Sequence, residues 1–540
     1  MERSALNAAK ERRTDIIVLG STPGGIMAAV AAAREGCRVL LLERSDHIGG
    51  LPANGLGATD IGTRGGTGGL FLEFVERVRA HYLEMYGVDS AQLRDCSDGY
   101  HFEPSVAERV LETMLAEVSD RVEVLRMHEF PSTGGLVEMA DGALRSLRVR
   151  NRLTGETVVC VGRVFIDATY EGDLFAAAGA PFRMGREGRA ETGEEMAGCL
   201  YQGWREPMHP ASTFEGDHRV QAYNYRLCLT ERAGNQRAFE RPPSFVREEY
   251  LSLIDDVRTN RWAGKIGPEL HLEGIGRLTN MVILPNGKTD ANNQHLAFLS
   301  TDLPEENQGW VTGSWAFRDA FAQRLRDYTE GLLWFAANDP EVPEAFRQRC
   351  ARWGFAADEY TDNGNFPRQV YVREGRRLEG RYVFSAKDVL PLASTGRPPV
   401  HADSVTASHY ALDSHAVRKR EADRPHLEGF FNVSARPYTV PYRVMLPQKV
   451  ENLLVPVAVA GTHVGFSTLR MEPCWMALGQ AAGTAAALAL RAGHDRVAEV
   501  DITALQDRLW AGGAVLIHGA PEAKDAEKRT AWEREQLRQA

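Results

Sequence analysis

Two features near the start of the chain have residue types and spacing that suit nucleotide binding. One is Glu43, a carboxylate at the end of an apolar run. The other is a glycine-rich turn made of Gly20, Thr22, Pro23, Gly24 and Gly25. A helix that begins at such a turn directs backbone N–H groups and the positive end of its dipole toward a pyrophosphate. A carboxylate in the place of Glu43 can accept both ribose hydroxyls of an adenosine and would repel a 2′-phosphate.

The segments around these residues predict the strand–helix–strand unit that must position them. Residues Asp15–Gly20 form a short, β-branched apolar run, which is typical of a buried parallel strand. Thr22 can cap a helix whose first residue is Pro23 and whose body is the alanine-rich segment 24–36. Residues Cys37–Arg44 then predict the second strand. In this context the turn predicts a dinucleotide site, with a nucleotide-free unit of the same fold as the alternative.

Thr22 stands where the middle glycine of the usual G-x-G-x-x-G motif would be. It either sets the phosphate slightly back or supplies its own hydroxyl. A glycine pair, Gly49–Gly50, follows the second strand directly, and backbone passing this close to the ribose and phosphates favours FAD over NAD.

The run "IIVLGSTPGGIMAA", Glu43, the glycine pair and "GLGATD" together resemble the FAD-dependent oxidoreductases often labelled xanthan-lyase-like, within the glutathione-reductase-type FAD superfamily. A threonine commonly takes the middle glycine position in that family, while Gly24 replaces its usual alanine. The segment Val164–Arg189, "VFIDATYEGDLFAAAGAPFRMGREGR", is similar to the family's second FAD-contacting segment, although Tyr170 stands where glycine is commoner. The resemblance implies that the cofactor is FAD.

The segment Asn452–Leu490 resembles the C-terminal part of the same family. It also reads as a buried strand ending in glycine, followed by a small-residue helix whose N-terminus would point at the ligand. In related flavoproteins this helix faces the flavin and its dipole favours the anionic reduced form; a plain core helix is the alternative. The expected FAD contacts are Gly20, Thr22, Pro23, Gly24, Gly25, Glu43, Arg44, Gly49, Gly50, Leu51, Ala168, Thr169, Asp173, Thr462, Glu472, Met476 and Ala477.

The predicted fold class is α/β, with a discontinuous Rossmann-like FAD-binding domain of the glutathione-reductase type and an inserted α+β substrate domain. The middle of the chain, richer in Trp, Tyr, Arg and Pro, supplies the insertion. The predicted units are 14–181 for the first half of the FAD-binding domain, 182–387 for the substrate or cap domain, 388–492 for the second half and 493–540 for a helical tail.

Three further segments carry structural expectations. Residues 317–338 predict one or two helices, and residues 369–384 predict a hairpin with alternating positions. The charged segment 522–540 predicts a solvated helix.

Composition narrows the class of protein. The chain has 540 residues and a net charge of −10, without the clustered basic residues of a nucleic-acid footprint. The first 15 residues lack the apolar core of a signal peptide, and no apolar run is long enough to span a membrane, so a cytoplasmic location is expected.

The seven cysteines are scattered, which argues against structural zinc, an iron–sulfur cluster or a redox disulfide, and no metal is expected. Oligomerisation stays open.

The expected chemistry is hydride transfer from a substrate C–H to the flavin, while a base removes the adjacent O–H or N–H proton. The sequence offers no second nucleotide lobe and no cysteine pair, which excludes an NADPH:disulfide reductase. His415 and His463 are the candidate bases, each with a structural role as the alternative. Arg470 either holds a carboxylate or stabilises flavin charge, or it pairs with Glu472. Further candidates are Tyr410, Arg436, Tyr438, Tyr442 and Arg443.

Three function classes remain open at this point. The leading one is an FAD dehydrogenase or oxidase acting on a polar small molecule such as a sugar derivative, a hydroxy acid or a specialised metabolite. The second is a single-component flavin monooxygenase or double-bond reductase that binds NAD(P)H transiently. The third is a non-enzymatic binding protein with an FAD fold. A lyase reaction has no matching constellation of residues.

Overall fold

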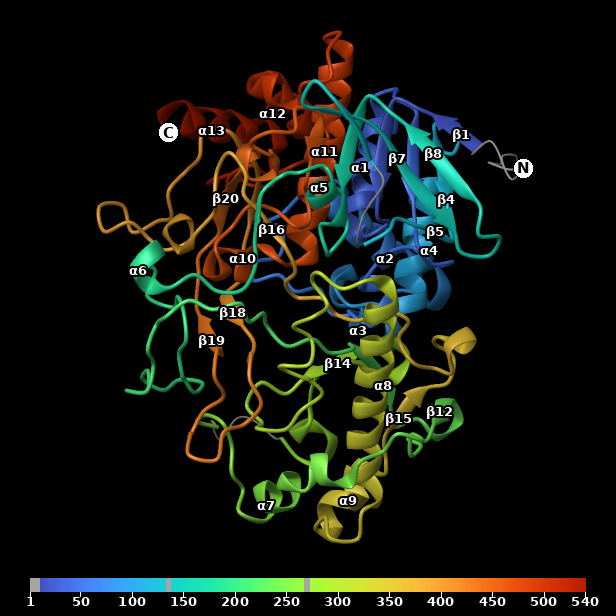
Figure 1. The fold of residues 1–540 in the computed structure, drawn as a ribbon, viewed down its shortest axis with the longest axis vertical. Coiled ribbons are helices and arrows are strands. Elements are labelled where there is room, and N and C mark those ends of the chain that lie inside the picture. Colours follow the sequence, from blue (N-terminus) through green and yellow to red (C-terminus); the bar gives the residue numbers. More distant parts are fainter. Residues whose placement is uncertain (1–9, 133–136, 267–271) are drawn as a thin grey trace, which may run out of the picture.

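The computed structural model describes residues 10–132, 137–266 and 272–540. The expectation about a signal peptide rests mainly on residues 1–9, which lie outside this description. In Figure 1 the first and last parts of the chain together form the upper half of the molecule, and the middle part forms the lower half. This arrangement is mixed α/β, whereas the predicted domain boundaries remain predictions.

A parallel five-stranded sheet organises the upper half, with the strand order β21-β9-β2-β3-β4. Its central strand β2 has β3 on one side and β9, from much later in the chain, on the other. The strand order therefore reverses beside β2, and crevices at such reversal points are where open parallel sheets bind ligands. The strands are β2 (Ile16–Leu19), β3 (Val39–Leu42), β4 (Val122–Leu125), β9 (Val164–Asp167) and β21 (Leu453–Leu454).

Helices α1 (Pro23–Arg34) and α11 (Glu472–Arg491) pack against each other beside this sheet. Small residues permit the close approach: a Cβ added at Gly479 or Gly483 would lie 2.0 or 2.1 Å from a main-chain carbonyl oxygen of α1. The glycines of α11 thus bring the start of this late helix next to the nucleotide-type turn at the start of α1.

A second, mixed sheet of five strands extends the upper half, with the order β1-β8-β7-β5 and β6 paired to β7. Only the β1–β8 pair is parallel. The strands are β1 (Lys10–Arg13), β5 (His128–Glu129), β6 (Val137–Ala140), β7 (Ala143–Asn151) and β8 (Thr157–Val161).

The remaining elements of the upper half connect and cover these sheets. The helices are α2 (Leu70–Tyr86), α3 (Ala91–Asp95), α4 (Pro104–Ala116), α5 (Asp173–Ala177), α6 (Arg189–Thr192), α10 (His463–Leu469), α12 (Ile502–Ala511) and α13 (Ala526–Gln539). Two strand pairs, β17 (Ser404–Ser408) with β20 (Tyr438–Pro441) and β18 (Leu412–Ser414) with β19 (Phe431–Val433), complete it.

The C-terminal helix α13 is present as predicted but is not solvated all round. Glu533 is fully buried and accepts hydrogen bonds from the Trp510 indole and the Leu516 amide, each at 2.8 Å. These bonds anchor one face of the tail to the preceding segment.

The lower half is built on an antiparallel sheet with the order β12-β15-β11-β14-β13. Its strands are β11 (Leu227–Thr230), β12 (Gln236–Arg237), β13 (Thr279–Leu284), β14 (Lys288–Asn293) and β15 (Gly354–Ala356). The helices are α7 (Ser252–Arg258), α8 (Trp315–Asn338) and α9 (Glu344–Cys350), so the segment predicted as one or two helices is a single long one.

The hairpin predicted for residues 369–384 is wrong. Strand β16 (Arg377–Leu378) pairs instead with β10 (Phe182–Arg183), far back in the sequence. The reason is charge: Arg373, Arg376 and Arg377 are all buried and bind distant carboxylates and carbonyls, so the segment crosses the interior rather than folding on itself. Among the described residues, no helix combines the length and apolarity needed to cross a membrane.

Candidate functional site

The nucleotide-type turn is held closed by Thr22. Its side-chain oxygen accepts the Gly25 amide at 3.2 Å, which caps α1, and its hydroxyl donates to the Ala168 carbonyl at 2.8 Å. The hydroxyl proton is thus used to tie the turn to the end of β9. Because the hydroxyl is engaged within the protein, these bonds disfavour the alternative in which Thr22 supplies its own hydroxyl to the phosphate.

Glu43 is fixed at the end of β3, where the motif requires it. One carboxylate oxygen accepts the Ser21 hydroxyl at 2.6 Å and the Ser21 amide at 3.1 Å, and the other accepts the Ser45 amide at 2.7 Å. The segment that follows β2 and the segment that follows β3 therefore both orient this carboxylate.

A cleft of about 1090 Å³ opens beside this turn, at the carboxyl ends of β2 and β3. Two tryptophans from the lower half, Trp310 and Trp315, also line it, and sequence reasoning missed both because no motif links them to the turn. The expected FAD contacts that line the cleft are Gly20, Thr22, Glu43, Arg44, Gly50, Thr169 and Asp173. The expected contacts that are buried outside its lining are Pro23, Gly24, Gly25, Gly49, Leu51, Ala168, Thr462, Glu472, Met476 and Ala477.

Asp173 and Thr462 already have protein partners. The carboxylate of Asp173 forms ion pairs with Arg318 at 2.5 Å and Arg376 at 2.7 Å, which link it to the middle of the chain. Thr462 caps α10 and donates to the Glu194 carboxylate at 3.0 Å.

The start of α11 carries buried polar atoms without partners. The Tyr170 hydroxyl donates to Glu472 at 2.5 Å and accepts the Leu51 amide at 3.2 Å, so this tyrosine bridges the glycine-pair loop and the helix. Burial raises the pKa of the Glu472 carboxyl to about 8. The second oxygen of Glu472 and the indole N–H of Trp475 are buried with no hydrogen-bond partner. A helix N-terminus with unsatisfied polar atoms beside the crevice is consistent with a bound flavin.

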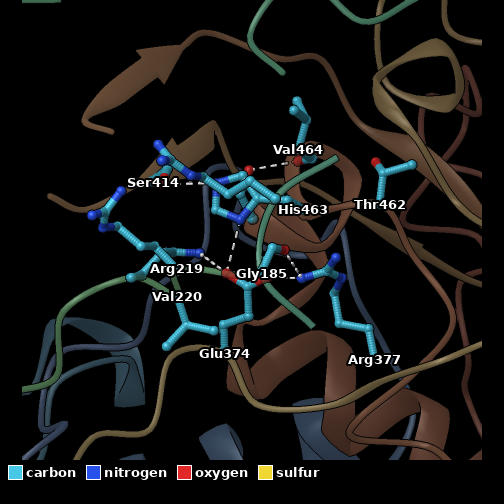
Figure 2. A network of polar contacts seen from close by, with 12 residues as sticks. Gly185, Arg219, Val220, Glu374, Arg377, Ser414, Thr462, His463 and Val464 are labelled. Atoms are coloured by element: carbon cyan, nitrogen blue, oxygen red, sulfur yellow. Dashed lines mark hydrogen bonds and ion pairs between the residues drawn. The ribbon is translucent and has the colours of Figure 1, made fainter. Parts of the chain in front are cut away.

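His463 lies in a buried network at the start of α10 (Figure 2). Its Nδ1 is 2.9 Å from a Glu374 carboxylate oxygen and its Nε2 is 3.2 Å from the Ser414 hydroxyl, so both ring nitrogens are engaged. Burial opposes ionisation of Glu374, but His463 and Arg377 outweigh it and lower the pKa of this carboxyl to about 2. His463 is 1% exposed and lines neither the cleft nor the second cavity described next.

A second cavity, of about 920 Å³, lies where residues of the middle part of the chain meet the segment 415–430, and His415 is in its wall. The His415 Nδ1 is 2.9 Å from an Asp302 oxygen, and its Nε2 makes a longer contact of 3.5 Å with an Asp413 oxygen. Burial would raise the pKa of Asp302, but Arg373 and His415 together lower it below its ordinary value. Sequence reasoning found the histidine and missed Asp302 because 113 positions separate them.

Arg470 joins this cavity wall to α11. Its guanidinium donates to the Asp413 carboxylate and to the Tyr371 hydroxyl, each at 2.9 Å, and not to Glu472 as one alternative proposed. Burial opposes ionisation of Asp413, but its contacts with His415 and Arg470 hold its pKa well below the usual range. Acidic and basic side chains therefore alternate along a row of contacts made by Asp302, His415, Asp413 and Arg470. Arg470, at the end of this row, lies two residues before α11 begins.

Four of the other tyrosines and arginines considered from sequence lie elsewhere, whereas Tyr410 lies near Asp413 and Arg470. The Tyr442 hydroxyl donates to the Val497 carbonyl, and Arg443 pairs with Asp403. Arg436 and Tyr438 line a third, open groove. The neighbouring Asp60 carboxylate and burial raise the pKa of the Tyr410 hydroxyl well above its ordinary value, so it stays protonated. All seven cysteines are free, and the described residues contain no cluster of His, Cys, Asp and Glu that could hold a metal ion.

The sequence profile of a family described as FAD dependent oxidoreductase matches residues 15–509. The chain belongs to this family: it is an oxidoreductase enzyme and its cofactor is FAD. The turn, the fixed Glu43 and the unpartnered atoms at α11 fit that cofactor.

Three similar solved structures share less than a fifth of their residues with this chain. L-proline dehydrogenase from P. horikoshii is 14% identical over 30% of this chain and 23% of its own, with a TM-score of 0.18. Glycerol-3-phosphate dehydrogenase from Bacillus halodurans, complexed with FAD, is 11% identical over 36% and 44%, with a TM-score of 0.23. The flavin-dependent monooxygenase PieE, in complex with FAD and substrate, is 18% identical over 33% and 34%, with a TM-score of 0.22. The matched part is thus less than half of each solved chain, and no curated protein sequence matches.

Proposed function

We propose that this enzyme is an FAD-dependent dehydrogenase or oxidase that takes a hydride from a C–H next to O or N of a small molecule with a polar reacting end. The observation that carries the proposal is the Asp302–His415 pair in the wall of a 920 Å³ cavity. FAD, when bound, accepts the hydride. The protein's task is then to hold the substrate, take its proton and exclude water.

The cofactor would lie along the crevice of the parallel sheet. Glu43 would accept the ribose hydroxyls, and the amides at the start of α1 would face the pyrophosphate. The start of α11, with Glu472 and Trp475, would face the flavin. In this proposal the upper half is a discontinuous FAD-binding domain of the glutathione-reductase type, and residues 182–387 are the inserted substrate domain.

His415 is the proposed base. With its Nδ1–H donated to Asp302, its Nε2 lies 3.5 Å from an Asp413 oxygen, and the ring borders the cavity, where it can take a proton from the substrate. The Asp413 carboxylate, 3.5 Å from Nε2, stabilises the charge that develops on the ring. Arg470 holds Asp413 in that place. His463 borders neither the cleft nor the cavity, and we assign it a positioning role at the start of α10.

The test is anaerobic reduction of the purified yellow holoenzyme by candidate substrates, followed by the loss of flavin absorbance. We expect bleaching by a substrate alone, without a nicotinamide cofactor. Bleaching only on addition of NADPH or NADH would overturn the proposal in favour of a monooxygenase or double-bond reductase. A purified protein that binds no flavin would overturn the whole assignment.

A further inference from the structure

We infer that the 920 Å³ cavity takes a neutral molecule with a flat apolar ring, placed so that the carbon bearing its hydroxyl or amine faces His415. This inference rests on the proposed function, because it names the substrate class for the same site. The sequence predicts a polar small molecule as the substrate. The inference restricts this class to molecules whose only polar group is the hydroxyl or amine that reacts.

Part of the wall is apolar. The residues Phe298, Leu299, Leu303, Leu427 and Phe430 line the cavity beside polar residues that include Ser252, Asn293, Gln294 and Ser300. The apolar part gains free energy by covering a ring.

His295 supplies a neutral polar group in this wall. Its ring lies 4.9 Å from that of Trp204 and stacks on Phe430 at 5.8 Å with an interplanar angle of 10°. Burial lowers its pKa, which keeps the imidazole uncharged at neutral pH. It makes no hydrogen bond to any residue in the described part of the chain, so it can bind a hydroxyl, and its ring extends the aromatic surface.

The cations at the cavity rim are neutralised by the protein itself. Lys419 pairs with Glu306 at 2.6 Å, and Arg420 pairs with Asp256 at 3.0 Å. Arg418 likewise faces acidic side chains at 3.3 and 3.6 Å. Each of these cations already faces a carboxylate, which weakens the attraction of the rim for an anionic substrate.

Arg420 also covers an aromatic wall residue, because its guanidinium lies 4.1 Å from the centre of the Phe298 ring. This cation–π contact places the half-buried Phe298 at the mouth of the cavity, where a ring entering from solvent would meet it. Phe298 is therefore the position at which a change should alter ligand choice with the least effect on folding.

In the proposed reaction, FAD accounts for the hydride and His415 accounts for the proton. For an alcohol, the C–H bond is lost as a hydride that reduces FAD, the O–H proton passes to the His415 Nε2, and the C–O bond becomes a carbonyl. For an amine, the N–H proton takes the same path and the product is an imine.

A matched pair of ring ligands tests the inference: 1-naphthalenemethanol, which is neutral, and 1-naphthoate, its anionic counterpart. Equilibrium dialysis of each against the holoenzyme measures binding without turnover, and glucose serves as a polar competitor. We expect the alcohol to bind about tenfold or more tightly than the carboxylate, and glucose not to displace it. Equal or tighter binding of naphthoate, displacement by glucose, or no binding of the alcohol at millimolar concentration would overturn the inference.

Three variants locate the binding. Phe298→Ala should weaken binding of the alcohol about fivefold, and Phe298→Lys, which adds a cation without a partner, should reverse the preference toward naphthoate. Phe317→Ala changes an exposed phenylalanine outside the cavity and should leave both affinities unchanged. An unchanged preference in both Phe298 variants would contradict the assigned cavity.

The two proposals fail in different ways. If ring alcohols bind as expected but no bound alcohol or amine bleaches the flavin anaerobically, the proposed hydride transfer fails and the ligand class stands. If sugars or hydroxy acids bleach the flavin while naphthalenemethanol does not bind, the proposed function stands and the ligand class fails.

Discussion

His415 and His463 have the same kind of partner in two different surroundings. Each directs Nδ1 at a carboxylate 2.9 Å away, Asp302 for the first and Glu374 for the second. The difference is in the surroundings of the ring: the Nε2 of His463 contacts the Ser414 hydroxyl inside a closed network, while the Nε2 of His415 makes a long contact of 3.5 Å with Asp413 and its ring borders a cavity. A carboxylate–histidine pair is therefore informative about catalysis only when the second nitrogen can reach a substrate.

The largest expected effect separates the two histidines by rate. His415→Gln should slow flavin reduction by substrate about 10²–10⁴-fold, because it removes the group that takes the proton. His463→Gln should lower the free energy of unfolding while leaving the rate per bound flavin within a few-fold of the wild type. Anaerobic stopped-flow absorbance, normalised to flavin content, measures both rates. Equal losses of rate in the two variants would contradict the claim that only His415 takes the substrate proton.

A buried glutamate tests the structural side of the comparison. Glu374→Gln should lower the free energy of unfolding at pH 7 by about 3–5 kcal/mol, because it leaves Arg377 with one carboxylate fewer in the interior. The pKa of Glu374 is about 2 in the folded protein against an ordinary 4.5, so its contribution is complete above pH 4.5 and is lost as the pH falls toward 2. Urea unfolding at several pH values should show that the free energy of unfolding decreases less toward low pH in the variant than in the wild type. An equal decrease in both proteins would contradict the assigned ion pair.

Glu472 should show the opposite dependence on pH, because it has no cation beside it. Its pKa is about 8 in the folded protein, above its ordinary 4.5, so the folded state keeps a proton that the unfolded chain loses. The free energy of unfolding should then decrease as the pH rises from about 4.5 to about 8, by up to about 1.4 kcal/mol per pH unit. Glu472→Gln should remove this slope in the flavin-free protein; a wild-type slope in the variant would refute the buried protonated acid.

The smallest expected effect concerns the second carboxylate beside His415. Asp413→Asn keeps the size of the side chain and its contact with Arg470 but removes the charge near Nε2, and we expect about a tenfold loss of flavin reduction rate, or 1.4 kcal/mol. Asp403→Asn is the matched control, since it alters an Arg–Asp pair with Arg443 outside both cavities. Similar rates in the Asp413 variant and the wild type would remove this aspartate from the mechanism.

The sequence predicted the nucleotide-type unit well because its determinants are local. Thr22 caps the helix that begins one residue later, and Glu43 ends the next strand, so both follow from short-range pattern. The alternating pattern of the charged segment around Arg377 predicts a hairpin, and this prediction is wrong. A local pattern does not reveal the distant acidic residues that the segment binds.

The substrate side could not be predicted in the same way. Asp302 reaches His415 across 113 positions, and Trp315 reaches the cleft beside the nucleotide-type turn from a helix in the other half of the molecule. Such contacts depend on how the halves pack, which no local motif records. His415 is a candidate base by residue type alone, whereas its partner and its cavity are visible only in three dimensions.

Chemical rescue tests the central claim most directly, namely that His415 takes the substrate proton from within an open cavity. In His415→Gly, the deleted ring leaves space that connects to the cavity, so added imidazole should restore flavin reduction in proportion to its concentration. In His463→Gly, the closed surroundings should prevent any such rescue. Restoration in the His463 variant, or none in the His415 variant despite normal flavin content and substrate binding, would contradict the assignment.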